Sequence, residues 1–158
     1  MSGTIVVLNG PSSAGKTTLA RTVRDKLGAN AVALAVDDFF GFVHRDASRG
    51  WQLFDALTAA MFASASTFAT RGFDVIVDTV FERRESLATA IAHGARLVAV
   101  TCPLDVLEQR ERDRGDRTIG QARAQHEYVF QRATYELTLD TAKQSVEECA
   151  DRVIAILR

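Results

Sequence analysis

A glycine-rich segment of eight residues constrains the fold of this chain more than any other part of its sequence. Residues 10–17 read GPSSAGKT, which matches the pattern G-x-x-x-x-G-K-[ST] of a phosphate-binding loop. Residues 4–8 before it form an apolar, β-branched run, and residues 16–27 have the apolar spacing of a helix. Because the pattern lies between a predicted strand and a predicted helix, we expect it to bind nucleotide phosphates.

The residue types in this segment suit the chemistry of phosphate binding. Its glycines let the backbone close around phosphate oxygens with the N–H groups pointing inward, and the N-terminus of the following helix favours negative charge. We expect Lys16 to reach the β- and γ-phosphates of a nucleotide, and the Thr17 hydroxyl to bind Mg²⁺, which prefers oxygen ligands. The residues predicted to contact the nucleotide here are Gly10, Pro11, Ser12, Ser13, Ala14, Gly15, Lys16, Thr17 and Thr18.

Strands and helices are expected to alternate along the chain. Apolar runs predict five buried strands, at residues 4–8, 31–36, 75–77, 97–101 and 135–139. Apolar spacing and helix breakers predict helices at residues 16–27, 50–70, 83–93, 104–114, 119–133 and 143–157. Strands that are buried on both faces are typical of parallel sheets, so we expect an α/β fold, with one domain over residues 1–158 and helices on both sides of a mainly parallel sheet.

The charge balance and the cysteine and histidine content argue against several kinds of partner. The 158 residues include 19 Lys+Arg and 20 Asp+Glu, for a formal net charge of -1, so no overall basic field attracts nucleic acid. The two cysteines lie outside any CxxC spacing, and the three histidines share no metal-ligand spacing. We therefore expect a protein of the reducing cytoplasm that does not bind nucleic acid.

The longest weakly polar stretch, residues 53–68, is better explained by a core helix than by a membrane span. It contains polar residues along its length, whereas Phe54, Leu57, Met61 and Phe68 fall near one helical face. The N-terminus leads directly into the first predicted strand and leaves no room for an export signal. We expect no association with a membrane.

Two aspartates stand directly after predicted strands. Asp37 follows the second strand and Asp78 follows the third, and ligands of open α/β sheets bind outside the carboxyl ends of the strands. We expect Asp78 to hold Mg²⁺ and Asp37 to orient an acceptor hydroxyl for attack on the γ-phosphate. Asp38 competes with Asp37 for that role, and helix capping is the alternative for both Asp37 and Asp78.

A run of charged residues near the middle of the chain suggests a lid. Arg110, Arg114 and Arg117 are spaced so that a helix continued past Gly115 would place all three on one face. We expect Arg110 and Arg114 to contact the nucleotide, and Arg114 and Arg117 to stabilise the charge of the transferring phosphoryl group. Gly115 and Gly120 are candidate hinges, and a solvated helix face with salt bridges is the alternative.

The residues named so far resemble the chloramphenicol phosphotransferases, small P-loop kinases that phosphorylate a hydroxyl of the antibiotic. Further matching positions lie in the predicted third strand, the lid and the C-terminal end, namely Val77, Val80, Phe81, Gly120, Ala122, Gln125, Asp140, Thr141, Glu148, Cys149 and Ala150. Pro11, Thr17 and Asp38 differ from the residues expected there, and residues 39–70 show no clear match. The acceptor region is therefore the part that the resemblance describes least.

The resemblance implies a P-loop kinase-like, three-layer fold with a five-stranded parallel sheet and a helical lid. It also implies ATP with Mg²⁺ as donor, and transfer of the γ-phosphoryl group to a hydroxyl of a small molecule, with antibiotics such as chloramphenicol among the candidates. Zeta-toxin-like sugar-nucleotide kinases and adenylylsulfate or shikimate kinases share the loop and act on other acceptors. The alternative is a nucleotide-binding regulatory module or ATPase that acts through a protein partner, and a homo-oligomer is compatible with either.

Aromatic residues gather directly after the proposed base. Of the twelve aromatic residues in the chain (Phe 9, Tyr 2, Trp 1), five fall within residues 39–54, namely Phe39, Phe40, Phe42, Trp51 and Phe54. Ligand pockets are mostly apolar with a few placed polar groups. We expect Phe40, Phe42 and Trp51, with Asp37 and Asp38, to bind a ring-bearing alcohol, and ordinary core packing is the alternative.

Overall fold

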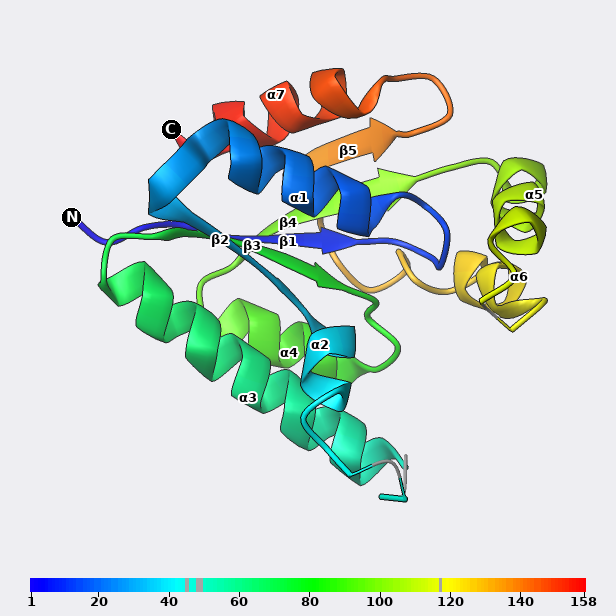
Figure 1. Ribbon diagram of the computed structural model, residues 1–158, viewed down its shortest axis with the longest axis horizontal. Coiled ribbons are helices and arrows are strands. Elements are labelled where there is room, and N and C mark those ends of the chain that lie inside the picture. Colours follow the sequence, from blue (N-terminus) through cyan, green and yellow to red (C-terminus); the bar gives the residue numbers. More distant parts are fainter. Residues whose placement is uncertain (45, 48–49, 117) are drawn as a thin grey trace.

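Five parallel strands form the centre of the computed structural model, which describes residues 1–44, 46–47, 50–116 and 118–158 (Figure 1). The strands are β1 (Ile5–Asn9), β2 (Ala31–Ala35), β3 (Asp74–Thr79), β4 (Arg96–Thr101) and β5 (Leu137–Asp140). Their order across the sheet is β2-β3-β1-β4-β5, so β1 is central and Leu8 stands opposite both Asp78 and Val98. The expected α/β fold with a five-stranded parallel sheet is confirmed.

Helices cover both faces of this sheet and one of its ends. They are α1 (Lys16–Leu27), α2 (Val36–Phe40), α3 (Trp51–Thr70), α4 (Arg84–Ala92), α5 (Leu104–Arg114), α6 (Gln121–His126) and α7 (Val146–Leu157), with a 3-10 turn at Gly28–Asn30. In Figure 1, α1 and α7 lie on one face and α3 and α4 on the other, whereas α5 and α6 lie beyond the carboxyl ends of the strands. Ligands of open α/β sheets bind outside the carboxyl ends of the strands. We therefore expect the site between these ends and the helices α5 and α6.

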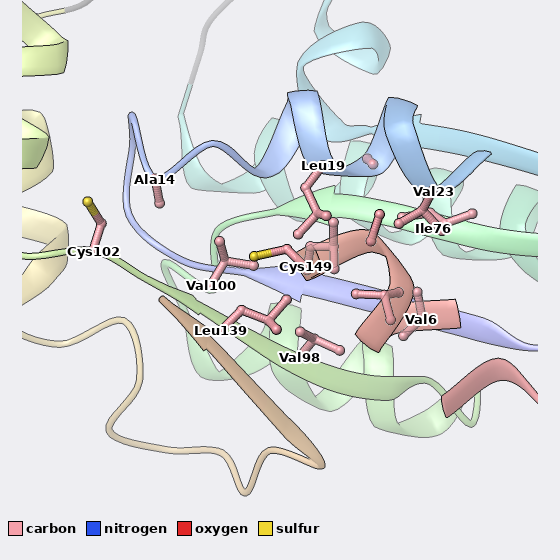
Figure 2. Close-up of a cluster of buried hydrophobic side chains, with 14 of the residues drawn as sticks. Val6, Ala14, Leu19, Val23, Ile76, Val98, Val100, Cys102, Leu139 and Cys149 are labelled. Atoms are coloured by element: carbon pink, nitrogen blue, oxygen red, sulfur yellow. The ribbon is translucent and has the colours of Figure 1, made fainter. Parts of the chain in front are cut away.

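The alternating side chains of β1 explain why this strand is apolar throughout. Val6 and Leu8 pack into the cluster beneath α1 and α7 (Figure 2), and Ile5 and Val7 pack into the cluster beneath α3 and α4. Successive side chains of a strand point to opposite faces, so a strand covered on both sides needs apolar residues at every position. Packing on both faces thus fixes the position and direction of β1, and with them the point at which the glycine-rich loop begins.

The edges of the sheet differ from the sequence-based expectation of five buried strands. β2 and β5 have a neighbour on one side only, and most of their residues are half-buried. β5 also begins at Leu137, two residues later than predicted. The expectation was wrong for these two strands because apolar composition does not distinguish an edge strand from a central one.

Two helical segments also differ from the prediction. Val36 and Asp37 belong to the short helix α2, so the second strand ends one residue earlier than expected. The helix predicted over residues 119–133 extends only from Gln121 to His126. Beyond it, the carbonyl of Val129 accepts a tertiary hydrogen bond from Asn9 Nδ2 at 2.9 Å, which favours turns over a continued helix.

The long helix α3 packs through a stripe that agrees with the predicted one at Met61 and Phe54 but not at Phe68. Its buried residues are Thr58, Met61, Phe62, Ala65 and Ala69, whereas the Phe68 side chain is 37% exposed. The placement of Phe68 in the core was therefore wrong. Among the described residues, no helix combines the length and the apolar composition needed to cross a membrane.

Candidate functional site

The glycine-rich loop curves tightly between β1 and α1. Ser13 and Gly15 have positive φ angles of 66° and 92°, and a Cβ on Gly10 would lie 2.2 Å from the carbonyl oxygen of Val100. In the described part of the chain, no side chain caps the N-terminus of α1, so the first N–H groups of this helix are available to phosphate oxygens. The hydroxyl of Ser13 is buried without a hydrogen-bond partner among the described residues, which also fits a loop that binds an anion.

The two residues proposed to hold a metal lie in contact. The Thr17 hydroxyl donates to Oδ2 of Asp78 at 2.5 Å, and Asp78 is 8% exposed at the carboxyl end of β3. In the described part of the chain, no group of three or more His, Cys, Asp or Glu residues could hold a metal ion. Mg²⁺ bound to nucleotide phosphates needs only one or two protein ligands, so this oxygen pair fits it.

Two cavities meet at the loop. The outer cavity, about 880 Å³, lies between the loop and the residues that follow β5. The inner cavity, about 270 Å³, lies between the loop and the ends of β2 and β3. The cavities share the residues Ser13, Gly15, Thr17, Thr18, Ala35, Asp37, Asp78 and Arg114. We call the space between these shared residues the junction. A ligand group at the junction is therefore accessible from both the outer and the inner cavity.

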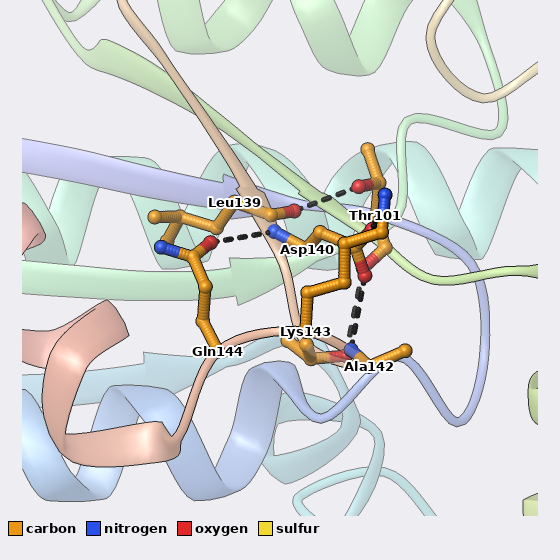
Figure 3. Close-up of polar contacts among 7 residues, drawn as sticks. Thr101, Leu139, Asp140, Ala142, Lys143 and Gln144 are labelled. Carbon is orange, nitrogen blue, oxygen red and sulfur yellow. Dashed lines mark hydrogen bonds and ion pairs between the residues drawn. The ribbon is translucent and has the colours of Figure 1, made fainter.

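The wall of the outer cavity is built from the loop after β5 and from Arg110. The guanidinium of Arg110 donates to the hydroxyl and the carbonyl of Thr141, both at 3.1 Å, and Thr141 donates to the carbonyl of Ala14 at 2.8 Å. Figure 3 shows the neighbouring contacts at the carboxyl ends of β4 and β5, where Asp140 N donates to Gln144 Oε1 at 3.0 Å. Arg110 thus lines the outer cavity, and its contact with a nucleotide stays a prediction.

The lid departs from its predicted helical arrangement. α5 ends at Arg114, because Gly115 adopts the left-handed conformation with φ of 66°, so the predicted continuation of this helix past Gly115 was wrong. Arg114 lines both cavities and pairs with Asp116 at 3.1 Å, and Arg117 lies outside the described residues.

A buried glutamate ties the start of α6 to α5. The carboxylate of Glu111, 1% exposed, accepts from the backbone N–H groups of Gly120 at 2.8 Å and Ala122 at 2.9 Å. Carboxylates at a helix N-terminus are favourable because they satisfy N–H groups without an intrahelical partner. The predicted hinge at Gly120 is thus anchored, and sequence reasoning missed Glu111 because charged runs usually face solvent.

The two neighbouring aspartates occupy different positions. Asp37 lines both cavities, whereas Asp38 lines only the outer cavity. Both are exposed in the first turn of α2. Asp37 therefore has access to a group in the inner cavity that Asp38 lacks.

The aromatic cluster contributes to the inner cavity only in part. Phe40 and Phe54 line the cavity, with ring centroids 6.2 Å apart. Phe42 is 80% exposed and packs against Phe39, and Trp51 is 53% exposed and packs against Phe54. Neither Phe42 nor Trp51 lines the inner cavity, so the structure does not meet the expectation that they join its wall.

Several polar residues of the inner cavity were not proposed from the sequence. Gln125 Oε1 accepts from the N–H of Ser12 at 2.6 Å, and Gln125 Nε2 donates to Glu82 at 2.5 Å. The Tyr128 hydroxyl donates to the other oxygen of Glu82, and burial together with this carboxylate raises the pKa of Tyr128 well above its usual range. Gln125 had been noted only for a family resemblance, and no spacing rule joins it to Glu82.

Comparisons with known proteins identify relatives of this chain by sequence. A family model described as chloramphenicol phosphotransferase-like protein matches residues 3–158. A Mycobacterium tuberculosis protein whose name proposes O-phosphotransferase activity is 26% identical over 178 residues, which cover 94% of this chain and 79% of that protein.

Solved structures of kinases share the fold. The Mycobacterium tuberculosis APS kinase CysC, in complex with AMPPNP and APS, superposes with a TM-score of 0.78 at 23% identity, over 99% of this chain and 98% of that one. Shikimate kinase from Acinetobacter baumannii, in complex with shikimate, has a TM-score of 0.70 at 16% identity, over 97% and 92%. At these identities the likeness shows the P-loop kinase fold.

Proposed function

We propose, from the premise that the chain belongs to the chloramphenicol phosphotransferase-like family, that it transfers the γ-phosphoryl group of ATP to a hydroxyl of a small molecule. The family and the kinase fold support phosphoryl transfer as the reaction class. The donor, the acceptor and the role of each residue are our inference. A cytoplasmic location, in keeping with two free buried cysteines, is part of the same proposal.

The meeting of the two cavities at the phosphate loop carries this proposal. A nucleotide in the outer cavity would extend its phosphates along the loop to the junction, where Lys16 and Arg114 line the inner cavity. An acceptor in the inner cavity would reach the same point from the side of Asp37. Phosphoryl transfer depends chiefly on positioning and electrostatic stabilisation, and a shared junction provides both.

Residues of the junction have complementary roles in this proposal. Lys16, 7% exposed, would exchange its hydrogen bond with the Pro11 carbonyl, 2.9 Å long, for the β- and γ-phosphates. Thr17 and Asp78 would hold Mg²⁺, which supplies charge neutralisation between the phosphate oxygens when bound. Arg114, with Arg117 of the lid, would stabilise the charge that spreads over the transferring group.

Asp37 is the proposed base. It would accept a hydrogen bond from the acceptor hydroxyl, orient that oxygen toward the γ-phosphorus and take up the proton as the new P–O bond forms and the bond between the γ-phosphorus and the bridging oxygen breaks, which releases ADP. Asp38, which lines only the outer cavity, is not placed for this contact. The assignment of the base therefore follows from which cavity each side chain borders.

The inner cavity limits what the acceptor can be. Phe40, Phe54 and Val80 provide apolar surface, and Thr79, which also lines the cavity, has a buried hydroxyl with no hydrogen-bond partner among the described residues. A molecule that combines a ring or apolar body with hydroxyl groups suits these walls. Antibiotics such as chloramphenicol belong to this class, and a resistance role is part of the proposal.

A direct test combines the protein with ATP, Mg²⁺ and a panel of hydroxylated compounds, including chloramphenicol. We expect one compound to gain the mass of one phosphoryl group and to stimulate ATP turnover, and we expect Lys16→Ala to lose both effects. ATP hydrolysis that no alcohol stimulates, together with nucleotide-dependent binding of a protein, would favour the regulatory alternative.

A further inference from the structure

A glutamine of α6 joins the phosphate loop to the opposite wall of the inner cavity. Gln125 contacts the backbone N–H of Ser12 at 2.6 Å and the carboxylate of Glu82 at 2.5 Å. It is buried, with 3% exposure, and it lines the inner cavity together with both partners. One side chain thus connects the segment after β1 with the segment after β3.

The chemistry of these two partners leaves Gln125 only one orientation. The N–H of Ser12 donates and therefore faces the amide oxygen, whereas the carboxylate of Glu82 accepts and therefore faces the amide nitrogen. Rotation of the amide by a half-turn would place donor against donor and acceptor against acceptor. An ionised glutamate or a methionine at position 125 cannot satisfy both partners, although each has a similar length.

Glu82 receives its hydrogen bonds from neutral groups. Gln125 donates to one carboxylate oxygen and the hydroxyl of Tyr128 donates to the other. The raised pKa of Tyr128 keeps this phenol protonated and able to donate. The other charged residues that line the cavity are Lys16, Asp37, Asp78 and Arg114.

We propose that Gln125 is a positioning residue for phosphoryl transfer, which fixes Ser12 of the phosphate loop relative to Glu82 and so aligns the γ-phosphate with the acceptor. This inference rests on the proposed function. Displacement of a reacting group by about 1 Å can cost on the order of 10²-fold in rate. Most of the residues predicted to contact the phosphates follow Ser12 in the sequence. Loss of the hydrogen bond between Gln125 and Ser12 should therefore lower kcat more than the affinity for ATP.

An exchange of the two side chains separates this role from simple packing. Gln125→Glu places two carboxylates against each other, whereas Glu82→Gln leaves one amide against another. In the double variant Glu82→Gln with Gln125→Glu, the amide of residue 82 again donates to residue 125, and residue 125 again accepts from Ser12. The matched control is Gln131→Glu, which makes the same charge change at an exposed position whose side-chain amide donates to the Glu127 carbonyl.

We expect Gln125→Glu to lower kcat about 10²-fold at neutral pH with a small change in the Kd of ATP. The double variant should recover most of that loss, since residues in contact show coupling that independent sites do not. Two adjacent carboxylates share a proton, so the kcat of Gln125→Glu should rise as the pH falls, unlike that of the double variant. Gln131→Glu should match the unaltered protein throughout.

A second measurement does not depend on turnover. In the nucleotide-free protein, Gln125→Met removes the acceptor of the Ser12 N–H, so amide exchange at Ser12 should accelerate while the folded state persists. Unchanged exchange there, or a double variant as impaired in kcat as Gln125→Glu, would overturn the inference. If the unaltered protein phosphorylates no alcohol, the proposed function fails instead, and the exchange rate still decides whether Gln125 holds the loop.

Discussion

The two sides of the inner cavity are held in place by different kinds of interaction. On one side, Ser12, Gln125 and Glu82 form a continuous chain of hydrogen bonds, and Gln125 is fully enclosed. On the other side, Asp37 lies exposed in a helix of five residues, which packs through Val36 and Phe40. Buried polar networks are rigid when every member is satisfied, whereas exposed segments carry specificity. The comparison suggests that the donor side is fixed and that the acceptor is selected on the α2 side.

The largest effect should come from Lys16, at the junction of the two sides. We expect Lys16→Ala to lower phosphoryl transfer by about 10⁴-fold or more, because no other described residue of the loop brings a positive charge to the β- and γ-phosphates. The side chain contacts the loop carbonyl of Pro11, so the melting temperature should change little. Steady-state kinetics and thermal unfolding measure the two quantities, and near-normal turnover would refute the assignment of the loop.

Replacement of Asp37 tests the exposed side. Asp37→Asn should lower kcat by about 10²–10⁴-fold, the range for loss of a positioned acid–base group, with the Kd for ATP retained. Asp38→Asn should have a smaller effect on kcat, because Asp38 does not line the inner cavity. The opposite ranking of the two variants would assign the base to Asp38 and reverse our reading of the two cavities.

Arg114 lines both cavities. Its replacement tests whether the lid stabilises the transition state more than it stabilises bound ATP. Arg114→Ala should lower kcat about 10²-fold, with a smaller loss of ATP affinity, because its charge stabilises the transition state more than the ground state. Arg112→Ala is the control, since Arg112 contacts Gln109 on the exposed part of α5. Weaker ATP binding at unchanged kcat would instead assign Arg114 to the nucleotide alone.

The smallest effect is expected at the apolar wall. Phe40→Ala should raise the KM of the acceptor about 10-fold, because it removes apolar contact area from the inner cavity, and the Kd of ATP should stay the same. Phe42→Ala, at a side chain that is 80% exposed, provides the comparison. Equal shifts in KM would mean that the acceptor extends beyond the inner cavity.

The parts of the site that could be predicted from the sequence are those with a local chemical pattern. The loop at residues 10–17 and the acid at the carboxyl end of β3 follow from rules that relate residue type to strand ends, and the structure brings Thr17 and Asp78 into contact. The central strands were predicted because each needs apolar residues on both faces.

The remaining features depend on contacts between segments that are distant in the sequence. Gln125 and Glu82 are 43 positions apart, and the buried carboxylate of Glu111 meets the start of α6 because α5 ends at Arg114 and the chain turns back. The aromatic cluster was assigned as a unit from its composition. Whether each ring faces the cavity depends on the turn of α2 and on the face of α3, which composition does not specify.

The contact between Lys16 and the Pro11 carbonyl has a consequence for the entropy of binding. A lysine side chain that becomes ordered loses rotamer freedom worth about 1.5–2 kcal/mol. In this protein the Lys16 side chain is already enclosed and hydrogen-bonded within its own loop. The entropy of the Lys16 side chain is therefore lost when the protein folds. When a phosphate oxygen of the nucleotide replaces the Pro11 carbonyl, the ammonium group is already ordered, and binding carries little further entropic cost for this side chain.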